Sequence, residues 1–227
     1  MKKKEKINPK KEKKMKKLKP IVVLLSAVLL VAATILGTVA YLTDTSEVVN
    51  TFTVGNVKIK LDESVVDKNG NPTGGRDEKG NEYHLVPGQS YTKDPMVTVL
   101  KGSEETYVRM IVTLNCSKEL DAIFAPNGVV LTDIFVGFDN TKWTYIGVTR
   151  DDAANTVSYE FRYYTSVKPA ADADLELEPL FNSIKVPTFI TGEQLETIKD
   201  LEISVEAHAI QASGFADANA AWAAFTK

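Results

Sequence analysis

The chain has 227 residues and a net charge of −3, but its charges are unevenly distributed. Residues 1–19 hold eleven lysines and two glutamates, which leaves 16 basic and 28 acidic residues in the rest of the chain. Nucleic-acid binding needs a basic face that neutralises phosphates, so we expect no nucleic-acid partner for so acidic a body. The single cysteine, Cys116, excludes an internal disulfide.

The first forty residues have the organisation of a secretory signal peptide. A basic n-region (1–19) precedes an apolar h-region (20–40), and Thr38-Val39-Ala40 is a small-x-small cleavage site. We predict cleavage between Ala40 and Tyr41. The alternative is a retained transmembrane helix, because about 20 apolar residues suffice to span a bilayer. We expect contact with the membrane only through this segment while it is uncleaved.

After the signal, residues 41–50 are predicted to form a flexible segment and a candidate donor strand, and residues 51–227 to form the folded domain. Phe52 and Val54 share one face of an alternating pattern that slips by one residue at Gly55, which indicates a bulge. The next apolar phase continues through Leu61. The stretch from Asp62 to Tyr83 is polar and glycine-rich, and we expect a mobile loop there.

The body of the chain reads as a series of short strands separated by turn residues, which predicts an all-β fold, an antiparallel jelly-roll-like β-sandwich. Two short helices are expected, one near 192–198 and one at about 217–226, capped by Asp217, with Trp222 and Phe225 on its apolar side. The strands are predicted at 96–100, 107–114, 129–135, 143–148, 157–163, 184–189 and 203–209.

No catalytic constellation is present, and we expect neither an enzyme nor a cofactor. The chain has two histidines, His84 and His208, and Glu206 shares a strand face with His208. We expect His208 to face solvent. These three residues are the only candidate metal ligands, and they lack the spacing of a zinc motif. Residues 67–78 match part of a calcium loop, but Pro72 replaces the turn glycine, which favours a plain hairpin.

The segment "LGTVAYLTDTSEVVNTFTVGNVKIKL" resembles the amino-terminal signature of the TasA/camelysin family of exported Gram-positive proteins. "LVPGQSYTKDPMVTV", "TYVRMIVTL" and the ending "AHAIQASGFADANAAWAAF" are similar to later blocks of its clostridial members. The positions that carry the signature are Gly37, Thr38, Ala40, Tyr41, Asp44, Asn50, Phe52 and Gly55.

The resemblance implies a secreted structural protein of the cell surface or biofilm matrix, processed by an ER-type signal peptidase. It also implies self-association into fibres or association with other matrix proteins, by donation of the N-terminal strand to a neighbour. The alternatives are a camelysin-like surface metallopeptidase and a membrane-tethered adhesin or accessory subunit. The residues expected in the assembly strand are Val48, Asn50, Phe52, Val54 and Gly55.

Overall fold

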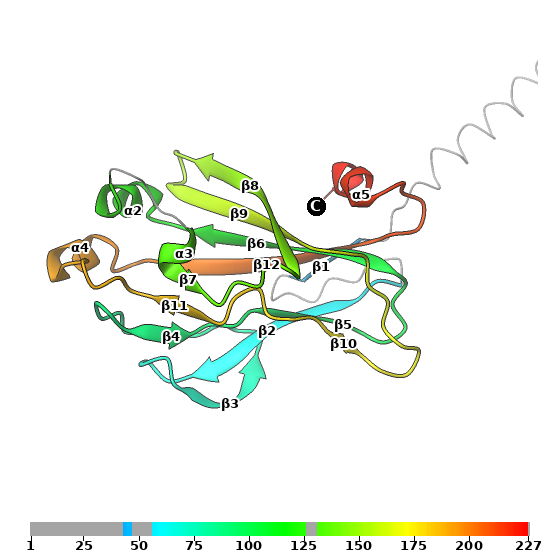
Figure 1. The fold of residues 1–227 in the computed structure, drawn as a ribbon, viewed down its shortest axis with the longest axis horizontal. Helices are drawn as coiled ribbons and strands as arrows, with labels where there is room; N and C mark the ends of the chain where they lie inside the picture. Colours follow the sequence, from blue (N-terminus) through cyan, green and yellow to red (C-terminus); the bar gives the residue numbers. More distant parts are fainter. Residues whose placement is uncertain (1–42, 47–55, 126–130, 227) are drawn as a thin grey trace, which may run out of the picture. The chain divides into compact units, whose positions relative to one another are not determined.

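The computed structural model describes residues 43–46, 56–125 and 131–226, which form antiparallel sheets with few helices, as predicted. Figure 1 shows the strands of the largest sheet on one side and β2, β3, β5 and β10 on the other. The five-stranded sheet has the order β1 (Thr43–Ser46), β12 (Ile203–Gln211), β6 (Thr106–Leu114), β9 (Thr156–Tyr163) and β8 (Trp143–Asp151).

Two smaller sheets complete the β structure. The four-stranded sheet has the order β10 (Leu175–Glu176), β5 (Met96–Val99), β2 (Ile59–Val66) and β3 (Pro72–Asp77). The three-stranded sheet has the order β4 (Ser90–Thr92), β11 (Ser183–Lys185) and β7 (Phe135–Val136). The described residues also form short helices between or after the strands: α2 (Ser117–Ile123), α3 (Leu131–Ile134), α4 (Gly192–Thr197) and α5 (Ala218–Ala224).

The sheets share one hydrophobic core, and the period-2 pattern of the strands explains how they fill it. On β6, Val108, Met110, Val112 and Leu114 are buried, while the residues between them are half-buried. The neighbouring strand β9 buries Val157, Tyr159 and Phe161 in the same way. Because alternate side chains point to opposite faces, one face of each strand enters the core. Side chains of β2, β5 and β11 close the core from the other sheets.

A second, smaller apolar cluster lies on the outer face of β12 and β6, under the C-terminal helix α5. Asp217 caps this helix by accepting a hydrogen bond from the Ala220 N–H at 2.8 Å. Trp222 and Phe225 pack over the Arg109 guanidinium, with ring centroids 4.5 Å and 4.7 Å from its central carbon. The predicted helix is therefore present, with its aromatic side against the sheet.

Three predictions of local structure are wrong. The strand expected at 184–189 ends at Lys185, the last residue of β11. Residues 131–134 form the helix α3 instead of a strand, because Leu131 and Ile134 have the i, i+3 spacing that faces one side of a helix. Residues 62–83 are not a mobile polar loop. They contain the end of β2 and the whole of β3, and Asp62 and Glu63 are buried because each has a cationic partner.

Candidate functional site: a groove beside β12

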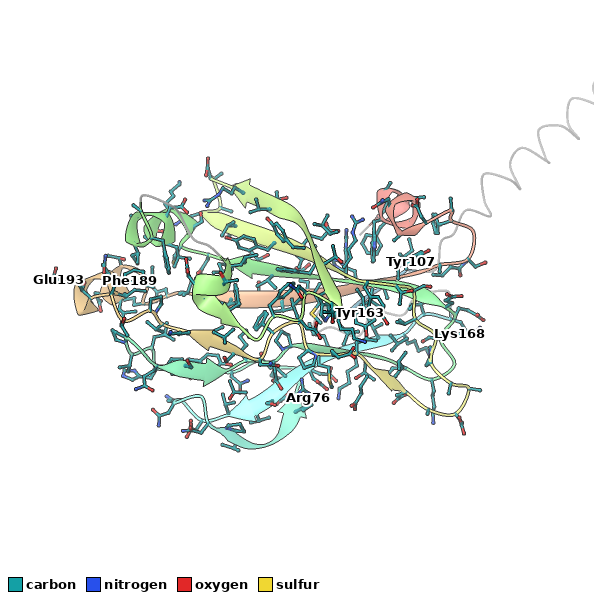
Figure 2. The ribbon with its side chains drawn as sticks, in the orientation of Figure 1. Arg76, Tyr107, Tyr163, Lys168, Phe189 and Glu193 are labelled. Atoms are coloured by element: carbon teal, nitrogen blue, oxygen red, sulfur yellow. The ribbon has the colours of Figure 1, made fainter. Side chains whose placement is uncertain are left out.

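A groove of about 1260 Å³ lies between β2 and β12. Its walls come from Leu61–Glu63 of β2, the segment from Asp77 to Leu85, α4 with the residues after it, and Ile203–Glu206 of β12. Figure 1 shows that α4 leads into β12 and that the β2–β3 hairpin lies below β12 in this view. In Figure 2, Phe189 and Glu193 mark the α4 end of the molecule. Segments distant in the sequence thus meet at one open depression.

Strand β12 has a neighbouring strand on each of its two sides. Strand β6 pairs with all of β12, from Ile203 to Gln211. On the other side, the N-terminal strand β1 pairs with Ala207–Ile210. The first described strand of the chain is thus added at the edge of the sheet, where backbone N–H and C=O groups bind an incoming strand.

The groove has apolar walls and an acidic rim. Leu61, Leu85, Ile203 and Val205 line it and also pack against the hydrophobic core. Leu195, Ile198 and Leu201 extend this apolar surface toward α4. The charged lining residues are mainly acidic: Asp62, Glu63, Asp77, Glu78, Glu82, Glu196, Glu202 and Glu206, against Lys79, Lys93 and Lys199. An uncharged apolar segment therefore suits the groove better than an acidic one.

Beside the groove, Arg76 of β3 joins the two acidic side chains Asp62 and Asp94. Its Nε donates to Asp62 Oδ1 at 2.5 Å, and its Nη1 donates to Asp94 Oδ2 at 2.8 Å. Its Nη2 donates to the backbone carbonyls of the same two aspartates. Figure 2 shows Arg76 beside β2 and β3. This fork of hydrogen bonds fixes the β2–β3 hairpin against the segment before β5.

We expect Asp94 to make stability depend on acid pH. Burial would raise the pKa of Asp94, but hydrogen bonds from the Ser64 N–H, Arg76 and the Ser64 hydroxyl outweigh it, so the pKa is lowered. Below about pH 4, the ordinary pKa of aspartate, the unfolded chain takes up this proton more readily than the folded chain. The free energy of unfolding should therefore fall as pH decreases through that range.

This pH dependence can be checked by urea denaturation between about pH 6 and pH 3. The Asp94→Asn variant should lose less stability over this interval than the wild type, because it has no carboxylate to protonate at this position. Equal changes in the two proteins would contradict the assignment.

At the base of the groove, the buried Glu63 carboxylate accepts hydrogen bonds from an amine and from a side-chain amide. Lys93 Nζ donates to Glu63 Oε2 at 2.8 Å, and Asn81 Nδ2 donates to Glu63 Oε1 at 3.0 Å. Glu63 and Lys93 are each 6% exposed. The sequence does not predict this cluster of Glu63, Asn81 and Lys93. Glu63 follows another acidic residue, and the stretch that contains both is expected to be a polar loop.

Two of the three candidate metal ligands lie together, since Glu206 Oε2 is 3.6 Å from His208 Nε2. His84 and Glu206 line the groove, whereas His208 is buried under α5, which corrects the expectation that it faces solvent. Its Nδ1 accepts a hydrogen bond from Arg109 Nε at 3.1 Å, and its ring lies against Phe225. His208 is buried because α5 covers the face of β12 that carries this side chain. Among the described residues, no three His, Cys, Asp or Glu side chains gather as metal ligands.

The partial calcium-loop match is an ordinary turn between β2 and β3. Asp67 Oδ1 accepts hydrogen bonds from the backbone N–H groups of Asn69 and Asn71, both at 2.9 Å. These bonds, with that from the Asn71 side chain, lower the pKa of Asp67. Its carboxylate is therefore occupied by its own turn, as in other Asx turns.

Several predicted residues lie outside the described part of the chain: the cleavage site Thr38, Ala40 and Tyr41, and the assembly residues Val48, Asn50, Phe52, Val54 and Gly55. The apolar segment 20–40 lies outside it too. None of the described helices is long and apolar enough to cross a membrane. No protein-family model, curated protein or solved structure matches this chain.

Proposed function

We propose that this protein is a secreted, non-catalytic structural protein of the cell surface or matrix. In this proposal it is a jelly-roll-like relative of the TasA/camelysin proteins, and it assembles into fibres by N-terminal strand donation. The observation that carries the proposal is the position of the N-terminal strand β1, which is added at the edge of the sheet on β12, beside the apolar groove. A strand from a neighbouring subunit can join such an edge by β-augmentation.

The register of β1 on β12 suggests how a donated strand would enter. In the described chain, Thr43 lies opposite Ile210 and Ser46 lies opposite Ala207. A neighbour's strand that took the place of β1 in this antiparallel register would place its Val48 opposite Val205 and its Asn50 opposite Ile203. Residues directly opposite in an antiparallel pair share a face of the sheet, so Val48 would meet the apolar wall.

The composition of the N-terminal segment fits the groove. Residues 48–55, with the sequence VVNTFTVG, carry no charge. They would therefore avoid repulsion from the acidic rim. Val48, Phe52 and Val54 fall on one phase of the strand and would face the leucine- and isoleucine-lined walls, while Thr51 and Thr53 fall on the other phase.

Filament formation tests this proposal. Protein purified from the culture medium, with an N-terminus verified at Tyr41, should form filaments visible by negative-stain electron microscopy. The Phe52→Asp variant should form none, because a carboxylate on the inward phase would have to enter an apolar wall. Sedimentation of the assembled fraction gives the same comparison as a number.

The Thr53→Asp variant is the matched control, since it adds the same charge one residue away on the outward phase. It should assemble like the wild type. If both variants assemble equally well, the inward strand is not used. If the wild-type protein stays monomeric under all conditions, N-terminal strand donation is wrong. An extracellular form that retains residues before Tyr41 would instead favour the membrane-tethered reading.

A further inference from the structure

The amine of Lys93 and the side-chain amide of Asn81 share one buried carboxylate, that of Glu63. Each nitrogen is bound to a different oxygen of this carboxylate, at 2.8 Å and 3.0 Å. We propose that Lys93 and Asn81 react within the folded domain to form an intramolecular isopeptide bond, with Glu63 as the residue that moves the protons. The bond would link the segment after β3, which contains Asn81, to the segment before β5, which contains Lys93.

The surroundings of Asn81 suit an amide that is attacked at its carbonyl carbon. Its Oδ1 accepts a hydrogen bond from the Val66 N–H at 3.0 Å, which would stabilise the negative charge that develops on this oxygen. Its Nδ2 donates to the Ser64 carbonyl as well as to Glu63, and these two acceptors fix which side of the amide is oxygen. The electrophile is therefore held and polarised by backbone groups of β2.

The reaction balances without any other reactant. Glu63 first takes a proton from the Lys93 ammonium, and the neutral amine attacks Cγ of Asn81. A second proton passes from this nitrogen through Glu63 to Nδ2 as the Cγ–Nδ2 bond breaks. The Nζ–Cγ bond remains as an amide, and ammonia leaves with the first proton as ammonium. Proton transfer through a positioned carboxylate is general acid–base catalysis.

The Glu63 and Lys93 side chains are buried, and the groove beside them is open to solvent. Glu63 and Lys93 are each 6% exposed, so bulk water has little access to the amine and the carboxylate. Burial, followed by the nearby Glu63 charge, raises the pKa of Tyr83, whose hydroxyl donates a hydrogen bond to the Thr92 carbonyl next to Lys93. Glu63, Tyr83 and Lys93 line the groove, through which ammonia can leave.

A plain ion pair is the competing interpretation of Lys93 and Glu63. An ion pair would explain the amine–carboxylate contact, but not why an amide with a polarised carbonyl binds to the second oxygen. The chain has a single cysteine and forms no internal disulfide, so a covalent closure of the fold has to use other side chains. The bond would join residues on either side of β4, next to the groove.

The mass of the intact purified protein tests the reaction directly. The wild type should be lighter than its sequence by about 17 Da, the mass of one ammonia. Lys93→Arg and Glu63→Gln should each restore the full mass, because the first removes the nucleophile and the second removes the proton carrier. The exposed Lys68 lies near Glu82, so Lys68→Arg is the matched control and should keep the deficit.

A tryptic map locates the bond. An acylated Lys93 resists trypsin, so residues 80–101 should be recovered as one internally closed peptide; without the bond, trypsin separates residues 80–93 from 94–101. A wild-type protein with the full sequence mass overturns the proposal. So does a deficit that persists in Lys93→Arg, since cyclisation of an Asn–Gly pair such as Asn69–Gly70 also releases ammonia. These wild-type measurements decide the matter even if Glu63→Gln fails to fold.

Discussion

Replacing Arg76 by methionine should lower the free energy of unfolding by about 3–5 kcal/mol, toward the lower end of that range. The substitution removes the cation shared by Asp62 and Asp94 and leaves two carboxylates side by side in a poorly solvated place. The Asp62 side chain is 4% exposed and that of Asp94 is 16% exposed. Lys60, at 2.8 Å from Asp62, still neutralises part of this charge, which is why we expect the lower end.

Arg150→Met is the matched control for this prediction. Arg150 forms two hydrogen bonds with Asp121, at 2.7 Å and 2.8 Å, so the contacts resemble those of Arg76. Both of these side chains are well exposed, at 40% and 38%. We expect a loss of about 1 kcal/mol or less, because solvent screens exposed pairs. Urea denaturation of both variants gives the comparison, and equal losses would show that burial does not matter to the Arg76 cluster.

The strands with strict alternation were predicted correctly from the sequence. On β6 and β9, every second residue is apolar and enters one continuous core, so the pattern and the tertiary structure agree. The same holds for the C-terminal helix, where the cap and the aromatic spacing are local signals. Such elements are predictable because the information that specifies them lies within a few residues.

The base of the groove was not predicted because its partners are distant in the sequence. Asp62 and Glu63 are adjacent, and alternation allows only one of them to face a core. In the structure β2 changes partner from β5 to β3 along its length, with an irregular register between Ser64 and Val66. Both carboxylates are consequently buried, one beside Arg76 and the other beside Lys93. A single sequence does not encode such pairings in any local pattern.

His208 was misjudged for a related reason. The period-2 pattern correctly assigned His208 to the face of β12 opposite the main core. In an antiparallel sheet, such a face is usually exposed to solvent. The C-terminal helix α5 covers this face and supplies Phe225 to the imidazole. Thus the phase of a strand predicts which face a residue occupies, but not whether a distant helix covers that face.

Substitution of Gly70 by alanine should destabilise the domain by about 3–4 kcal/mol. Gly70 occupies the left-handed region, with φ at 78°, in the turn between β2 and β3. A Cβ atom at this position would lie 2.6 Å from the Cα of Tyr91 and 2.7 Å from its Cβ. Tyr91 is 2% exposed, and its hydroxyl bonds to the His84 carbonyl and the Val86 N–H. It therefore has little freedom to move away.

Gly75→Ala separates the two contributions to this loss. Gly75 has the same φ of 78°, but nothing lies within 4 Å of the position a Cβ atom would occupy. Its substitution should cost only the backbone strain, about 1 kcal/mol. The difference between the two variants in thermal or urea denaturation then measures the close approach of the turn to Tyr91. Equal losses would mean that the turn yields, and that the β2–β3 hairpin is not packed against Tyr91 as tightly as the structure indicates.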